Sequence, residues 1–229
     1  MRKFETLPNT DEQLVRRLLD KLSNKETGVE DYRDAFNKLG QELGKAFSHS
    51  IQDIEPDEIM LACAAEDADW LAAGVELGMG KGNVRKSVFW NTRETVFKGD
   101  MGEELEISPI VKAYEEPIDV CRLLVVAKSI ISSSCVVKTQ LTRLIGKLNP
   151  ERIVILSPVL HKDGVPNLMR EFPQAIRSRF EFLTFAIDDD KLANGEVIPG
   201  IGGMVYPRLG LGDSIQKNSY VPEMVLSRL

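Results

Sequence analysis

The stretch 123–136 reads LLVVAKSIISSSCV and places polar residues shortly after a run of apolar ones. A buried strand that leads through a turn of small residues into a helix is a common phosphate site, because the amides at a helix N-terminus attract anions. Ser132, Ser133 and Ser134 can donate hydrogen bonds from backbone amides and hydroxyls, and Lys128 and Cys135 flank them. The alternative is a plain helix cap, since serine permits close approach less well than glycine.

Arg93 is the second candidate for anion binding, and it lies in a charged, glycine-containing segment at 92–106. Its guanidinium can face a pyrophosphate or form a surface ion pair with Glu94. His49 and His161 have no ligand or nucleophile partner at a motif spacing, so we interpret both as structural histidines.

Two further groups of charged residues are interpreted as solvated surface. Lys81, Arg85 and Lys86 form a small basic cluster at the expected end of a helix. The acidic run at 188–190 suggests Mg²⁺, but such a run before a loop is usually solvated. We therefore predict no metal site formed by protein side chains alone.

The spacing of apolar residues predicts the elements that must position these candidates. Two amphipathic helices are expected within 1–50, the first with Leu14, Leu18 and Leu22 on one face. Expected strands near 59–65, 87–90, 123–126, 152–156 and 180–186 alternate with helices near 70–77, 136–148 and 165–171. This alternation predicts an α/β fold with a mainly parallel central sheet and flanking helices.

Size, charge and cysteine content narrow the class of protein. With 229 residues, 43% of them hydrophobic, the chain is expected to form a single domain over 1–229. A net charge of −6 argues against nucleic acid or an anionic membrane as a partner. The three cysteines show neither zinc nor disulfide spacing, which favours a reducing, cytoplasmic location. No apolar run approaches the roughly 18 residues of a membrane span.

Six stretches together resemble the uracil phosphoribosyltransferase family along nearly the whole chain. The helical segments at 19–22, 31–36 and 39–43 are similar to its N-terminal helices, and 87–95 is similar to its strand that ends in an arginine flap. The stretch 123–135, whose residues 132–135 we call the serine stretch, stands where that family has its phosphoribosyl-pyrophosphate loop. The segment 187–200 resembles the lead-in to its uracil loop and is the most specific match.

The resemblance implies a type I phosphoribosyltransferase fold with a flap at 87–118 and a base-pocket loop at 195–220. It implies phosphate and ribose contacts at the serine stretch and at Lys128, pyrophosphate contacts at Arg93, and Asp188 as an anchor of the loop. It also implies Mg²⁺ if the chain is active, a small nucleotide or phosphoribosyl ligand, and a homodimer. The base-binding residues that it implies are Ile198, Gly200, Gly202, Gly203 and Arg208.

Several positions depart from the family pattern. Ala127 stands in place of an aspartate at the strand end, and 132–135 replaces a Thr-Gly-Gly-Ser turn. The segment 61–65 lacks the family's arginine, and Gly203 and Tyr206 stand in place of two acids of the uracil loop. Because transfer of phosphoribose depends on positioning and electrostatics, losing one such group often costs about two to three decades in rate.

Three functions remain open on this pattern. The first is a non-catalytic homologue that binds a ligand or a partner protein. The second is an active uracil phosphoribosyltransferase that makes UMP and pyrophosphate through a remodelled site, with an acid supplied by Glu66 or Asp67. The third is a transferase for another base or sugar phosphate. The missing carboxylates and arginine favour the first function.

Overall fold

The computed structural model describes residues 1–98, 104–133 and 135–229, and it forms a mixed α/β fold with a mostly parallel central sheet. The strands of this six-stranded sheet lie in the order β11-β9-β7-β2-β3-β6. All neighbours pair in parallel except β6, which runs antiparallel to β3. Their bounds are β2 Ile59–Ala64, β3 Arg85–Asn91, β6 Ile110–Glu115, β7 Leu123–Ala127, β9 Arg152–Leu156 and β11 Phe180–Leu183.

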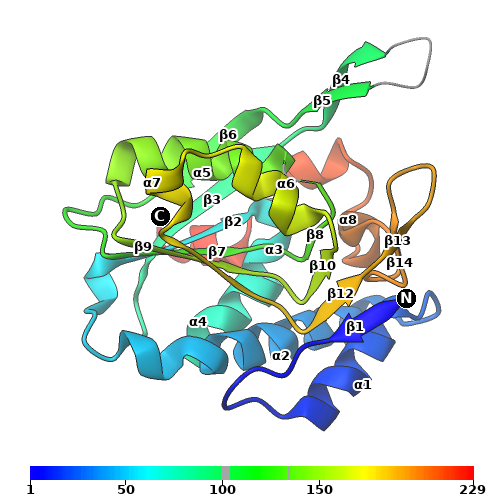
Figure 1. The fold of residues 1–229 in the computed structure, drawn as a ribbon, viewed down its shortest axis with the longest axis horizontal. Coiled ribbons are helices and arrows are strands. Elements are labelled where there is room, and N and C mark those ends of the chain that lie inside the picture. The colour runs from blue at the N-terminus through cyan, green and yellow to red at the C-terminus, as the bar shows by residue number, and fades with distance from the viewer. Residues whose placement is uncertain (99–103, 134) are drawn as a thin grey trace.

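Helices cover both faces of this sheet, as the sequences of its central strands require. Every residue of β2 and β7 is buried, which is typical of parallel strands packed on both sides. Alternate residues of β2 contribute to two apolar clusters, with Leu61 and Cys63 in one and Met60 and Ala62 in the other. Figure 1 shows α5 (Cys135–Leu148), α6 (Gly164–Arg170) and α7 (Gln174–Arg177) on one side and α1 (Glu12–Ser23), α2 (Val29–Ser48) and α4 (Ala73–Met79) on the other.

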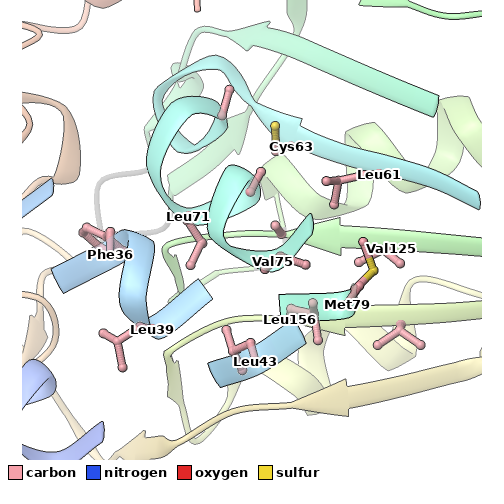
Figure 2. Packing of buried hydrophobic residues seen from close by; sticks show 14 of the residues in the cluster. Phe36, Leu39, Leu43, Leu61, Cys63, Leu71, Val75, Met79, Val125 and Leu156 are labelled. Carbon is pink, nitrogen blue, oxygen red and sulfur yellow. The ribbon is translucent and has the colours of Figure 1, made fainter. Parts of the chain in front are cut away.

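The two expected N-terminal helices are present as α1 and α2, and α2 crosses α4 very closely. Glycines of both helices allow this approach: a Cβ at Gly78 would lie 2.0 Å from the carbonyl oxygen of Gln41, and one at Gly44 would lie 2.3 Å from that of Val75. Figure 2 shows apolar side chains of α2, of α4 and of the helical segment Ala68–Ala72 before it gathered with those of the sheet, among them Phe36, Leu43, Leu71, Val75, Leu61 and Val125.

A second, four-stranded sheet continues three strands of the first. After short breaks, β7, β9 and β11 lead into β8 (Ile130–Ile131), β10 (Val159–His161) and β12 (Ala186–Asp188). These pair in parallel, and β1 (Arg2–Phe4) pairs antiparallel with β12 at the edge. The strand expected at 180–186 is therefore two strands that belong to different sheets.

The segment expected as a flap divides into parts with different roles. Residues of β3 and β6 belong to the central sheet, whereas β4 (Glu94–Lys98) and β5 (Glu104–Ile107) pair with each other as a separate hairpin. Figure 1 shows this hairpin extending away from the body of the molecule. Val96 and Phe97 are exposed on it. None of the helices in the part of the chain that the structure describes is long and apolar enough to cross a membrane.

Candidate functional site

The strand order creates a topological switch point between β2 and β7. The chain leaves β2 for β3 on one side, whereas β7 leads to β9 and β11 on the other. In open α/β sheets the loops diverge at such a point, and ligands bind outside the carboxyl ends of the strands there. The loop that follows β2 begins with α3 (Ala65–Asp67), and the serine stretch follows β7. Both loops thus start from the edge of the sheet where a ligand is expected.

A cavity of about 730 Å³ lies beside the serine stretch. The cavity is lined by Arg93, Ser132, Ser133 and Cys135. From the sequence we expected Arg93 at a pyrophosphate and the other three at the phosphate and ribose of the same ligand. Its remaining lining residues are Ile107, Ser108, Lys138, Thr139, Glu171, Lys191, Ala193, Asn194 and Gly195. Ser134 was part of the same proposal and lies outside the described residues.

Three cationic side chains give the cavity a positive wall. Arg93 is exposed, and Lys138 pairs with Glu171 at 2.5 Å. The ammonium group of Lys191 donates a hydrogen bond of 2.5 Å to the carbonyl oxygen of Ser132, which ties β13 (Asp190–Lys191) to the serine stretch. Burial lowers the pKa of Lys191, and the carboxylate of Asp163 opposes this shift. Lys138 and Lys191 were not among the candidates from the sequence.

Lys128 lies elsewhere, because it is buried at the switch point and paired with acids. Its ammonium group lies 2.5 Å from Asp67 and 3.6 Å from Glu66, and Lys217 lies 3.7 Å from Glu66 on its other side. We call Glu66, Asp67, Lys128 and Lys217 the buried charge cluster. Ala127, the last residue of β7, immediately precedes Lys128 and is fully buried. Because Lys128 pairs with Asp67, an acid from the loop after β2 is held next to the end of β7, where the resemblance implied an aspartate.

Burial and charge act against each other within the buried charge cluster. Burial alone would lower the pKa of Lys128, but Asp67 and Glu66 together raise it above its usual value. Burial raises the pKa of Asp67 despite Lys128. Burial would also raise the pKa of Glu66, but the ammonium groups of Lys128 and Lys217 outweigh it and hold this pKa below the usual value. Glu66 Oε2 and Asp67 Oδ1 accept no hydrogen bond within the described residues.

The candidates from the base-pocket loop form a turn that is fixed by backbone geometry. Gly200 and Gly202 have φ angles of 55° and 74°, a region that favours glycine, and the Ile198–Pro199 bond is cis. Asp188 accepts hydrogen bonds from the Gly200 amide at 2.9 Å and from Arg2 at 2.7 and 2.8 Å. Asp188 therefore anchors the loop, as the resemblance implied.

The end of this loop packs against the N-terminal helices. A Cβ at Gly202 would lie 2.4 Å from the carbonyl oxygen of Leu22. Arg208 donates hydrogen bonds to the carbonyl oxygens of Asn24 and Lys25, and its guanidinium lies 4.5 Å from the centre of the Tyr32 ring. Of the described residues that line the cavity, none is Ile198, Gly200, Gly202, Gly203 or Arg208. The cavity therefore includes the proposed phosphate contacts Ser132, Ser133 and Cys135, but none of these five proposed base contacts.

Four buried polar residues beside the cavity were missed by the sequence analysis. They come from separate elements and are Asn91, Ser108, Gln140 and Lys217, with exposures of 4%, 2%, 0% and 7%. We call them the polar cluster. A buried polar atom without a partner costs about 1–3 kcal/mol, so such clusters are kept only where structure or ligand binding requires them. No spacing in the sequence links these four positions.

Histidine, thiol and metal chemistry receive little support from the geometry. His161 is buried on β10, where its Nδ1 accepts a hydrogen bond from the Asp163 amide, which fits the structural role we expected. Burial raises the pKa of Cys63, and it raises that of Cys121 to about 11. Across the described ranges, no group of three or more His, Cys, Asp or Glu side chains is arranged to hold a metal ion.

Comparisons with known proteins show the fold but no family. No protein-family model matches the chain, and no curated protein matches it. The AQ2163 protein from Aquifex aeolicus superposes with a TM-score of 0.66 at 14% identity, over 89% of this chain and 97% of that one. This likeness shows a shared fold.

Two further solved structures are less similar. The protein TT1426 from Thermus thermophilus gives a TM-score of 0.43 at 11% identity, over 82% of this chain and 96% of that one. An adenine phosphoribosyltransferase from Thermoanaerobacter pseudethanolicus gives 0.39 at 12% identity, over 67% and 80%. These scores are too low to support an argument about function.

Proposed function

We propose that this protein binds a phosphorylated small molecule of the phosphoribosyl or nucleotide kind and does not carry out ordinary uracil phosphoribosyl transfer. The observation that carries the proposal is the cavity of about 730 Å³ in which the serine stretch meets Arg93 and Lys191. The resemblance to uracil phosphoribosyltransferases supports the same ligand class, a cytoplasmic location and a homodimer.

The cavity has the features that an anion requires. It lies at the start of α5, a helix of 14 residues that begins with Cys135, so the helix dipole favours negative charge there. Three cations line it, and Glu171 is the one acid among its described lining residues. Because Lys138 already pairs with Glu171, Arg93 and Lys191 are the cations with most capacity to bind a phosphate.

The sites expected for catalysis argue against ordinary transfer. Ala127 offers no side-chain acceptor for ribose hydroxyls at the strand end, and Gly203 and Tyr206 offer no carboxylate in the loop. Of the nearby acids, Asp67 bonds to Lys128, and Glu66 lies between Lys128 and Lys217. Carboxylates held by buried ammonium groups are poorly available to a substrate.

One observation favours an active transferase as the second candidate. Glu66 Oε2 and Asp67 Oδ1 are buried at the switch point without hydrogen-bond partners among the described residues, and a ribose hydroxyl would satisfy either. Those described residues do not form a metal site by themselves, so Mg²⁺ would have to arrive with the phosphates of the donor. Under this candidate the protein makes UMP from uracil, or acts on another base.

Calorimetric titration of the full chain tests the proposal. Phosphoribosyl pyrophosphate and UMP, each with Mg²⁺, are titrated into the wild type, Arg93→Ala and Lys191→Ala. We expect binding to the wild type and a rise in Kd of about tenfold or more in each variant, because a hydrogen bond to a charged group is lost.

Lys38→Ala is the matched control, since Lys38 is an exposed cation on α2 that pairs with Asp34. It is expected to leave both Kd values unchanged. The absence of binding to the wild type, or equal affinities in the wild type, Arg93→Ala and Lys191→Ala, would overturn the proposal.

A further inference from the structure

The polar cluster borders the proposed ligand cavity through Ser108, and hydrogen bonds connect its members. Gln140 Nε2 donates to Asn91 Oδ1 at 3.0 Å, and Asn91 Nδ2 donates to the carbonyl oxygen of Ser108, also at 3.0 Å. The ammonium group of Lys217 donates to the carbonyl oxygen of Asn91 at 2.7 Å. These bonds join β3, α5, the segment after β5 and the C-terminal region at one point.

The bonds also fix the orientation of both amide side chains. A carbonyl oxygen only accepts, so the Asn91 atom that faces Ser108 must be its NH₂ group, and Oδ1 must face Gln140. Gln140 therefore points its own NH₂ group at Asn91. Its Oε1 is left as a pure acceptor, fully buried and without a partner within the described residues.

A second polar atom of the polar cluster is also buried without a hydrogen-bond partner among the described residues. Ser108 Oγ is buried and has no hydrogen-bond partner in the described part of the chain. Ser108 lines the cavity, as do Thr139, which adjoins Gln140, and Arg93, which lies two residues after Asn91. Ser108 therefore joins the cavity to the other members of the polar cluster, because its carbonyl oxygen accepts the hydrogen bond from Asn91.

We propose that the polar cluster recognises a neutral hydrogen-bond donor, an N–H or O–H group, on the ligand whose phosphate lies at the serine stretch. Gln140 Oε1 accepts from this donor, and the Ser108 hydroxyl turns to accept from or donate to the same group. This inference rests on the proposed function and narrows it to phosphorylated ligands with a neutral polar end. A second anionic group would meet the acceptor oxygen of Gln140 and be disfavoured.

The substitution Ser108→Ala separates ligand recognition from a structural role. Removing an unpartnered buried hydroxyl is expected to leave the Tm unchanged or raise it, because no hydrogen bond within the protein is lost. The same change is expected to raise the Kd of UMP, which carries both hydroxyl and N–H donors, by about three- to tenfold. The Kd of inorganic phosphate should stay the same.

Ser157→Ala is the matched control, since Ser157 is also fully buried but donates a hydrogen bond of 2.7 Å to the carbonyl oxygen of Val159. It is expected to lower the Tm and leave both Kd values unchanged. For Ser108→Ala, an unchanged Kd of UMP, an equal rise for UMP and phosphate, or a lower Tm would overturn the inference. If the wild type binds phosphoribosyl pyrophosphate but not UMP, only this inference is overturned. If the wild type binds none of the three probes, the proposed function is overturned as well.

Discussion

The ammonium group of Lys128 lies 2.5 Å from a carboxylate oxygen of Asp67, although 61 residues separate them in the sequence. Lys128 directly follows β7, and Asp67 lies in the short helix α3 that follows β2. Because β2 and β7 are the neighbouring strands at the switch point, the fold brings the two residues together. Lys128 directly follows Ala127, the position at which the resemblance implied a carboxylate. The pair thus places a cation at the end of β7 and an acid in the loop after β2.

Breaking this pair should destabilise the protein strongly. Lys128→Met removes the cation and leaves Asp67 and Glu66 buried without it, which is expected to cost about 3–5 kcal/mol in free energy of unfolding. Urea unfolding measures this change. The exposed pair of Lys38 and Asp34 is the comparison, and Lys38→Met should change stability by less than about 1 kcal/mol. Equal effects of the two substitutions would contradict a buried charge cluster.

The close crossing of α2 and α4 predicts opposite effects for two glycine substitutions. Gly78→Ala places a Cβ 2.0 Å from a backbone carbonyl oxygen of α2, so the helices must move apart, at a cost of about 3 kcal/mol or more. Gly146→Ala, within α5, meets no atom within 4 Å and should stabilise the protein by about 0.5–1 kcal/mol. Thermal unfolding of both variants checks this, and a stable Gly78→Ala variant would refute the crossing.

His161 predicts the pH dependence of stability. Burial, aided by the ammonium group of Lys191 and opposed by Asp163, lowers the pKa of His161 below its usual value of 6.5. Between these two pKa values the unfolded chain binds the proton and the folded chain does not. Stability should therefore fall as the pH drops below about 6.5, until the folded-state pKa is passed.

Replacing His161 with glutamine should reduce this loss, measured as the difference in free energy of unfolding between about pH 8 and about pH 5, on either side of the usual histidine pKa. His49→Gln removes an exposed histidine at the end of α2 and controls for the loss of a histidine as such. A pH dependence of the His161→Gln variant equal to that of the wild type would count against a buried, neutral imidazole.

The regular elements could be predicted from the sequence because their signals are local. The strands at 123–126 and 152–156 are found as β7 and β9, and the helix at 136–148 as α5, each within one residue. The second sheet could not be predicted in this way, because β8 and β10 contain two and three residues. Strands this short show no period, and their pairing depends on how the longer strands end.

Charged residues were predicted less well, because burial depends on partners that are distant in sequence or on other elements. Lys86 was expected in a solvated cluster, which is wrong: it is 1% exposed within β3 and pairs with Glu76 of α4 at 2.5 Å. Lys128 was expected at the phosphate, but it pairs with acids at the switch point. Arg93, Ser132 and Ser133 do meet at one cavity, because a strand end and a helix start fix their relative positions.

Self-association remains a prediction from the resemblance. A homodimer should appear in light scattering at micromolar concentration as twice the chain mass of 25.6 kDa. The exposed Val96 and Phe97 of the β4–β5 hairpin offer an apolar surface for such contacts. A single species at the mass of one chain would show that the protein is a monomer.

Formation of UMP from labelled uracil and phosphoribosyl pyrophosphate with Mg²⁺ is the most direct test of binding without transfer. We predict no UMP above the background without protein, for the wild type and for Ala127→Asp, because the missing groups lie on both substrate sites and one carboxylate repairs only one of them. Wild-type turnover near 1 s⁻¹ or faster, within the ordinary range of enzymes of roughly 1–10³ s⁻¹, would contradict the account.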